Sequence, residues 1–197
     1  NSGTIKNTSS GRSVQLKGSS GVTLTNTGTI ESATQVAVDF TDSVNPNIIN
    51  RGTIKSTVNQ AKVIDFLQSA GTGEGGTLEN YGTIINSTGS RGQAIRIGSG
   101  AGEWDDLKII NSGTISSIGE SVLVSGGSET TGLNITTKGE GTWVGEIEME
   151  DAAVTMTLDC SISKDQDIEI EDKTNMVVVN NLCGNDTYAI LDFSKNA

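Results

Sequence analysis

The feature that most constrains the fold is a five-residue motif, Asn-x-Gly-Thr-Ile, which recurs along the first two thirds of the chain. Its five copies begin at Asn1, Asn26, Asn50, Asn80 and Asn111. A decayed sixth copy reads Gly139-Glu140-Gly141-Thr142-Trp143, and successive copies are separated by 25, 24, 30, 31 and 28 residues. A period of this length is typical of solenoids, in which each repeat forms one rung of a stack.

Each repeat holds three short stretches with alternating apolar residues, the pattern of strands that bury one face. The first stretch is the Gly-Thr-Ile segment itself. The second carries the pairs Val14/Leu16, Val36/Val38, Ile64/Phe66, Ile95/Ile97 and Val122/Val124. The third ends just before the next motif, at Leu24, Ile48, Leu78 and Ile109. Residues 1–139 show no helical period, so we predict an all-β, right-handed parallel β-helix with three short strands per rung and about seven rungs.

The polar residues of the motif have an expected structural role. In stacked rungs the asparagines Asn26, Asn50, Asn80 and Asn111 should form a ladder, their amides bonding to the backbone of a corner. The glycine two residues later should supply either a positive φ or a position too crowded for a Cβ. A second polar column, Asn7, Ser32, Ser56, Asn86 and Ser117, follows the isoleucines and is also interpreted as scaffold.

The character of the chain changes near residue 145, where the motif ends. We therefore divide it into regular rungs, 1–144, and irregular acidic rungs, 145–197. Residues 1–139 carry 11 acids and 10 bases, whereas residues 140–197 carry 13 acids and 3 bases, which together give the net charge of −11. The acidic end has carboxylates in strand-like alternation, but spacing alone does not make ligands converge, so we predict a solvated face rather than a Ca²⁺ site. No metal or cofactor is predicted.

The two cysteines, Cys160 and Cys183, lie in this acidic part. An even count in a chain without histidine fits an oxidising, extracytoplasmic compartment, and we predict a disulfide. Closing a loop of this size contributes about 3 kcal/mol on the chain-entropy model. Two unrelated buried thiols are the alternative.

The longer repeats contain Gly-rich inserts, 71–76 and 98–106, at the same point of adjacent rungs. Insertions in repeat proteins often map to the binding face, so these inserts should project side by side and bind a partner. The candidate binding residues are Trp104, Glu103, Asp105, Asp106 and Glu74, with Trp104 as an apolar contact in a polar loop. The alternative is that Trp104 folds back to cover the side of the helix. We expect deletion of 99–106 to preserve the fold and weaken partner binding.

Several chemistries are disfavoured by residue types alone. The chain has no histidine, which removes the commonest general base and metal ligand. The Gly-rich inserts lack the Lys-Ser/Thr ending of a phosphate-binding loop. Asp39 and Asp65 occupy equivalent outer positions one rung apart, which keeps a polysaccharide-cleaving β-helix as a distant alternative. The acidic balance also argues against nucleic acid. We predict no enzyme.

The recurring motif, in runs such as Thr25-Asn26-Thr27-Gly28-Thr29-Ile30-Glu31-Ser32, resembles passenger domains of bacterial type V autotransporters. The resemblance covers residues 1 to about 145. It implies export through the periplasm to the bacterial surface or into the medium, by way of an outer-membrane barrel outside this fragment. We expect a fragment because the sequence opens inside a repeat. The cysteine pair departs from the many passengers that lack cysteine.

The resemblance implies two classes of function. The first is a surface adhesin that binds a host cell-surface protein or glycan, or that mediates bacterial self-association. The second is a released virulence effector, either a vacuolating-type toxin fragment or a ligand of a host receptor. Clumping or attachment of cells distinguishes the first class, and saturable receptor binding by the soluble protein distinguishes the second.

Overall fold

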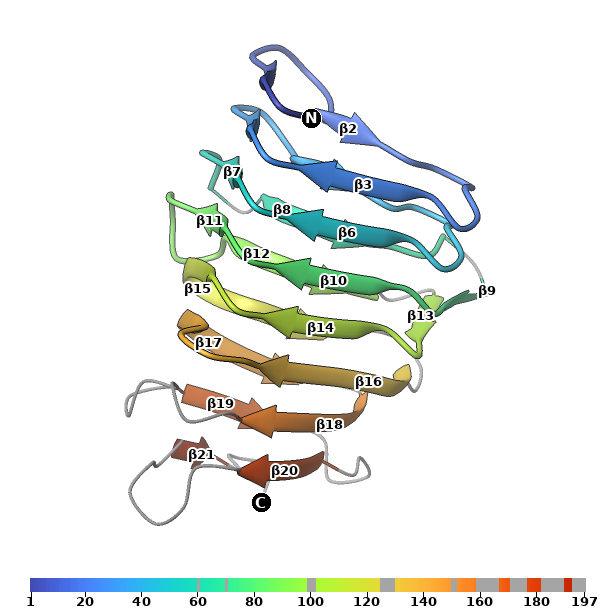
Figure 1. Cartoon of the computed structure of the whole chain (residues 1–197), viewed down its shortest axis with the longest axis vertical. Coiled ribbons are helices and arrows are strands. Elements are labelled where there is room, and N and C mark those ends of the chain that lie inside the picture. Colours follow the sequence, from blue (N-terminus) through green and yellow to red (C-terminus); the bar gives the residue numbers. More distant parts are fainter. Residues whose placement is uncertain are drawn as a thin grey trace.

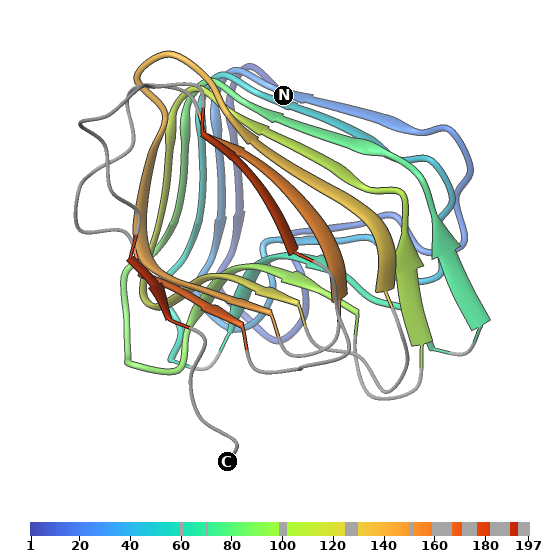
Figure 2. The ribbon, with the colours of Figure 1, turned by 90° about the horizontal axis from the view of Figure 1, so that it is seen from below.

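The computed structural model describes residues 1–59, 61–69, 71–98, 102–124, 130–149, 152–158, 167–170, 177–181 and 190–192. For residues 71, 72, 102, 103 and 130, and for all but Thr155 beyond 151, the description is limited to the backbone. Every described element is a β-strand, and all strand pairs are parallel. The chain is thus a parallel β-solenoid, as predicted, with successive rungs stacked along one axis (Figures 1 and 2).

The first strand position of the rungs begins with the Gly-Thr-Ile motif. It contains β1 (Thr4–Asn7), β4 (Thr29–Ser32), β7 (Thr53–Ser56), β11 (Thr83–Asn86), β15 (Thr114–Val124) and β17 (Thr142–Met149). Their register places Ile5, Ile30, Ile54, Ile84, Ile115 and Trp143 directly beside one another. From Ile30 onwards these side chains are buried, and they form one wall of the core.

The second strand position forms a continuous sheet with the first. It contains β2 (Val14–Gln15), β5 (Val38–Asp39), β8 (Lys62–Phe66), β12 (Gln93–Ile97), the later parts of β15 and β17, β19 (Asp167–Ile170) and β21 (Ile190–Asp192). Val14 pairs with Val38, and Val38 with Ile64. The predicted pair Val36/Val38 was therefore two residues out of register, because the buried pair of this rung is Val38 and Phe40. The connection from the first strand varies in length between rungs, so spacing along the chain does not fix this register.

The third strand position forms a separate sheet of seven strands. It contains β3 (Thr23–Asn26), β6 (Asn47–Asn50), β10 (Thr77–Asn80), β14 (Lys108–Asn111), β16 (Thr130–Thr137), β18 (Ala152–Leu158) and β20 (Val177–Asn181). Leu24, Ile48, Leu78 and Ile109 lie in register here, as predicted. The solenoid has about five turns, against the seven rungs predicted. In the first four rungs all three positions are separate strands, whereas in the fifth rung β15 covers the first two positions. Strands β17 to β21 extend the two sheets beyond these rungs.

The asparagine ladder lies at the corner between the third and first positions. Each side-chain nitrogen donates to the side-chain oxygen of the next asparagine, at 2.9 Å from Asn26 to Asn50, 2.8 Å from Asn50 to Asn80 and 2.9 Å from Asn80 to Asn111. All four asparagines are fully buried. The ladder therefore confirms the scaffold interpretation of the motif.

The motif glycines are required by crowding rather than by a positive φ. A Cβ on Gly52 would lie 2.1 Å from the carbonyl oxygen of Gly28, and one on Gly82 would lie 2.1 Å from that of Gly52. The backbones of successive rungs are in close contact here, at the corner that follows each ladder asparagine. In the first rung a Cβ on Gly3 would meet nothing within 4 Å.

Aliphatic ladders fill the interior, and one aromatic cluster joins them. The Phe40 and Phe66 rings are stacked with centroids 5.4 Å apart, and Trp104 packs edge-on against Phe66 at 5.2 Å. Within the described residues there is no helix of the length and apolarity needed to cross a membrane. The predicted domain boundary at 144/145 falls inside β17.

Candidate functional site

The Gly-rich inserts form a short extra sheet at one edge of the solenoid. β9 (Gly71–Glu74) and β13 (Gly102–Asp105) pair in parallel, with Trp104 opposite Gly73 and Asp105 opposite Glu74. The two strands lie side by side at the edge where the chain leads into β10 and β14 of the seven-stranded sheet (Figure 1). This juxtaposition is the one expected from the equal placement of the inserts in adjacent repeats.

Trp104 belongs to the core and not to the surface of this edge. Its side chain is fully buried, and its indole Nε1 donates to the carbonyl of Gly75 at 3.0 Å. A Cβ on Gly73 would lie 2.6 Å from the indole, so the insert glycine makes room for the ring. Trp104 therefore follows the alternative interpretation, in which it covers the side of the helix, and it offers no exposed contact to a partner.

Beside the β9–β13 pair, each of the five regular rungs has a residue of left-handed backbone conformation just before its core-facing residues in the seven-stranded sheet. These are Gly21, Asn45, Gly75, Asp106 and Gly132, with φ values of 63°, 50°, 65°, 54° and 69°. Backbone hydrogen bonds place them in neighbouring rungs: the Asn45 nitrogen donates to Glu74 at 2.7 Å, and the Asp106 nitrogen donates to Thr131 at 2.9 Å. Asparagine and aspartate tolerate this conformation better than other non-glycine residues.

Glycine and Asn or Asp alternate along this left-handed corner for a steric reason. A Cβ on Gly75 would lie 1.9 Å from the Asn45 side-chain oxygen, and a Cβ on Gly132 would lie 2.0 Å from an Asp106 carboxylate oxygen. The polar side chain of one rung therefore lies over the glycine of the next. The side-chain oxygens of Asn45 and Asp106 therefore lie against the backbone of Gly75 and Gly132.

A polar groove of about 440 Å³ lies along this corner. Its polar walls come from Asn45, Asn47, Glu74, Thr77, Asp106 and Lys108, and Gly75, Gly76 and Gly132 complete the lining. The groove spans four successive rungs, from the second to the fifth. We name it the corner groove.

The corner groove contains two of the five predicted binding residues, Glu74 and Asp106, both exposed. Asp105 instead accepts bonds from the Thr131 backbone nitrogen at 2.6 Å and hydroxyl at 2.9 Å. Of Glu103 the backbone alone is described. The sequence patterns did not indicate the other polar lining residues, Asn45, Asn47, Thr77 and Lys108. An Asn-Pro pair after a strand, at Asn45, was the available turn signal.

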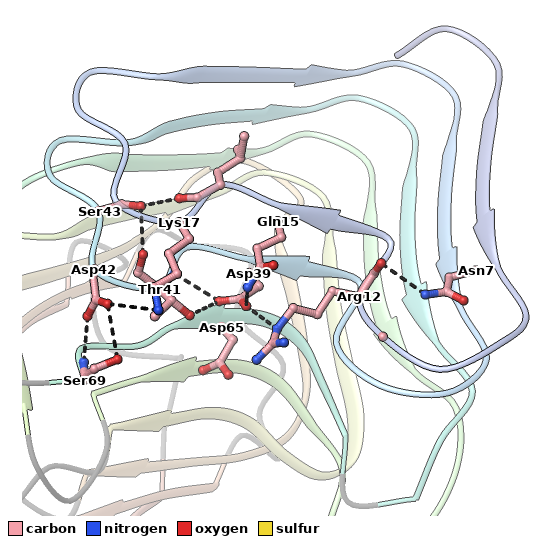
Figure 3. Close-up of polar contacts among 12 residues, drawn as sticks. Asn7, Arg12, Gln15, Lys17, Asp39, Thr41, Asp42, Ser43, Asp65 and Ser69 are labelled. Carbon is pink, nitrogen blue, oxygen red and sulfur yellow. Dashed lines mark hydrogen bonds and ion pairs between the residues drawn. The ribbon is translucent and has the colours of Figure 1, made fainter.

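A second polar cluster covers the outer side of the second strand position (Figure 3). Asp39 accepts hydrogen bonds from the Thr41 backbone nitrogen at 2.9 Å, the Thr41 hydroxyl at 2.5 Å and Gln15 at 3.1 Å, and it forms an ion pair with Arg12. In the next rung Asp65 is held at both carboxylate oxygens by Arg96, at 2.8 and 2.7 Å. On this face, ion pairs therefore join the first rung to the second and the third rung to the fourth.

Asp39 and Asp65 are adjacent in register, as predicted, but neither is open to a substrate. Asp39 is fully buried and Asp65 is 3% exposed. Their partners occupy oxygens that a general acid or base would need free. Burial and the neighbouring Arg96 lower the pKa of Lys62 at the edge of this cluster.

Among the described residues no three His, Cys, Asp or Glu side chains are grouped so that they could hold a metal ion. The predicted disulfide pair, Cys160 and Cys183, lies outside the described residues.

Comparisons with family models, with curated proteins and with solved structures find no match to this chain.

Proposed function

We propose that this chain is a segment of an exported bacterial surface protein of the autotransporter-passenger type, and that it acts as a binding module and not as an enzyme. Its role is attachment to host cells or bacterial self-association, at the cell surface or after release. The repeat motif supports the family, and the corner groove supports the binding role.

The observation that carries the binding role is the unpaired state of the groove's polar side chains. In the described chain, protein partners engage the asparagine ladder, Asp39, Asp65 and Asp105. Within that same part, the side chains of Asn45, Glu74 and Lys108 have no protein hydrogen bond or ion pair. Convergent polar groups in a groove can fix the orientation and the specificity of a ligand.

The proposal is tested with fluorescent beads that carry the purified chain. We expect the beads to attach to cultured epithelial cells or to cluster with one another, and soluble chain to compete with them. Beads carrying an Ile84→Asp variant, which places a charge in the core, are the control for a folded surface. Beads that neither attach nor cluster would contradict the proposed function.

A further inference from the structure

We propose that the corner groove binds an uncharged oligosaccharide, and that its lining excludes sialylated and sulfated glycans. This inference rests on the proposed binding function and adds the ligand class and the site.

The shape of the groove fits a chain-like ligand rather than an ion. It has a volume of about 440 Å³ and is lined by residues of four successive rungs. At a spacing of ~4.8 Å between paired strands, these rungs span roughly 14 Å along the solenoid axis. A single cation needs converging oxygens within a few ångströms, whereas a short sugar chain can follow the rungs.

The chemistry of the groove matches hydroxyl groups, which both donate and accept hydrogen bonds. Asn45 and Asn47 offer amide donors and acceptors, and Thr77 offers a hydroxyl. Glu74 accepts and Lys108 donates. The side chains of Asn45, Asn47 and Glu74 are exposed, so they are accessible to a ligand.

The backbone under these groups is fixed in advance by inter-rung hydrogen bonds. The Gly75 nitrogen donates to the Asp105 carbonyl at 2.8 Å, the Thr77 nitrogen to Pro46 at 2.9 Å and the Lys108 nitrogen to Gly76 at 3.1 Å. Preorganised sites lose less conformational entropy when they bind. The groove therefore presents its polar groups without refolding of the edge.

The charge of the groove sets the expected specificity. The carboxylates of Glu74 and Asp106 outnumber the Lys108 ammonium, which leaves one net negative charge. The chain as a whole carries −11, so the surrounding field also repels polyanions. The positive charge of Lys108 in turn disfavours the binding of a free cation. An uncharged ligand meets neither penalty.

The first experiment applies the purified chain to an array of immobilised neutral, sialylated and sulfated oligosaccharides. We expect retention on a subset of the neutral glycans and none on the charged ones. Retention confined to sialylated or sulfated glycans, or on no glycan at all, would overturn the inference.

The second experiment locates the site by filling the groove. Asn47→Trp introduces a large side chain at an exposed lining position, and Thr23→Trp is its matched control because Thr23 is the register partner of Asn47 one rung away, outside the groove. We expect Asn47→Trp to weaken binding of the best neutral glycan by roughly tenfold or more, and Thr23→Trp to change it by less than about twofold. Equal affinities of both variants would place the site elsewhere and overturn the inference.

A third variant tests the charge argument. In Glu74→Gln/Asp106→Asn both carboxylates become amides, and the second change keeps a side chain that tolerates the positive φ of its position. We expect this variant to gain measurable binding of sialylated analogues of the best neutral glycan, while Glu140→Gln, an exposed change outside the groove, does not. No gain in the double variant would contradict exclusion by these carboxylates. Bead attachment that survives in Asn47→Trp would overturn the groove's role while leaving the proposed function standing.

Discussion

The side-chain nitrogen of Asn50 lies 2.8 Å from the side-chain oxygen of Asn80, its register partner in the next rung. The same Asn80 donates to Asn111 at 2.9 Å. The three amides form one continuous, buried chain of hydrogen bonds, in which each member is both donor and acceptor. Removing Asn80 therefore takes one hydrogen bond from each of two buried neighbours, Asn50 and Asn111.

We predict that Asn80→Ala lowers the free energy of unfolding by about 2 kcal/mol, since it removes the hydrogen bonds of Asn80 to Asn50 and Asn111, each worth roughly 0.5–1.5 kcal/mol. The measurement is urea denaturation of the purified chain. Asn47→Ala, an exposed asparagine at the other end of the neighbouring strand, should leave the transition within about 0.5 kcal/mol. Equal effects of the two substitutions would show that the ladder adds no stability.

The glycine corner gives a second prediction. Gly82→Ala forces a Cβ to within 2.1 Å of the Gly52 carbonyl oxygen, so the rungs must separate locally. We expect a loss of about 1–3 kcal/mol, as in other overpacked sites. Gly3→Ala occupies the same position of the first rung and meets nothing within 4 Å, so it should be neutral in the same denaturation assay.

The Arg96–Asp65 pair is predicted to be strongly coupled. Arg96 holds both Asp65 oxygens, and its side chain is 19% exposed against 5% for the aspartate. Arg96→Met should destabilise the chain by about 2–3 kcal/mol, below the range for fully buried pairs, because it strands a buried carboxylate. Adding Asp65→Leu should recover much of that loss. A double-mutant cycle checks this, and additive effects would contradict the coupling.

Glu31 predicts part of the acid sensitivity. Hydrogen bonds from Lys6 and Lys55, at 3.1 Å each, lower the pKa of this carboxyl. Because the folded pKa is the lower one, the stabilisation is complete above the unfolded value of roughly 4.3 and is lost as pH falls through the folded pKa. Urea midpoints measured between pH 7 and pH 3 should fall less steeply in Glu31→Gln. A slope identical to that of the wild type would contradict this account.

Trp104 is predicted to matter for stability and not directly for contact with a partner. Trp104→Ala removes a fully buried ring from the cluster with Phe66 and should cost about 3–5 kcal/mol. Tyr81→Ala, at a ring that is 46% exposed, should cost far less in the same assay. The expectation that deletion of 99–106 preserves the fold is revised accordingly, because that deletion removes Trp104.

Much of the fold could be predicted because it repeats. The spacing of the motif asparagines predicted the register of the first and third strand positions. Their amides bond to the corner backbone, as predicted, and also to one another, which was not predicted. Identical residues at a fixed period leave few other ways to bury their apolar neighbours. The second position was less certain: the connection before Val38 differs in length from that before Val14, and the pattern placed Val36 where Val38 belongs and Val38 where Phe40 belongs.

The site was only partly predictable. The inserts indicated the right edge, and Glu74 and Asp106 do line the corner groove. Asn45 and Asn47 contribute to the groove from an earlier rung that carries no insert, so the inserts did not indicate them. The side chain of Trp104 turned inward because Gly73 in the neighbouring strand leaves space for its indole. Such contacts depend on which residues stack across rungs, and this is read from the register and not from the linear sequence.

The left-handed corner also limits how this molecule can change by rearranging its own repeats. The Asn45 side chain occupies the volume that a Cβ at position 75 would need, and Asp106 does the same to position 132. Two rungs that both carry a side chain there cannot sit next to each other without distortion. Duplication of a single rung that carries Asn or Asp here would therefore disturb this edge, whereas duplication of a glycine rung, or of two consecutive rungs, would preserve it, so lengthening is permitted only where no two of these side chains become neighbours.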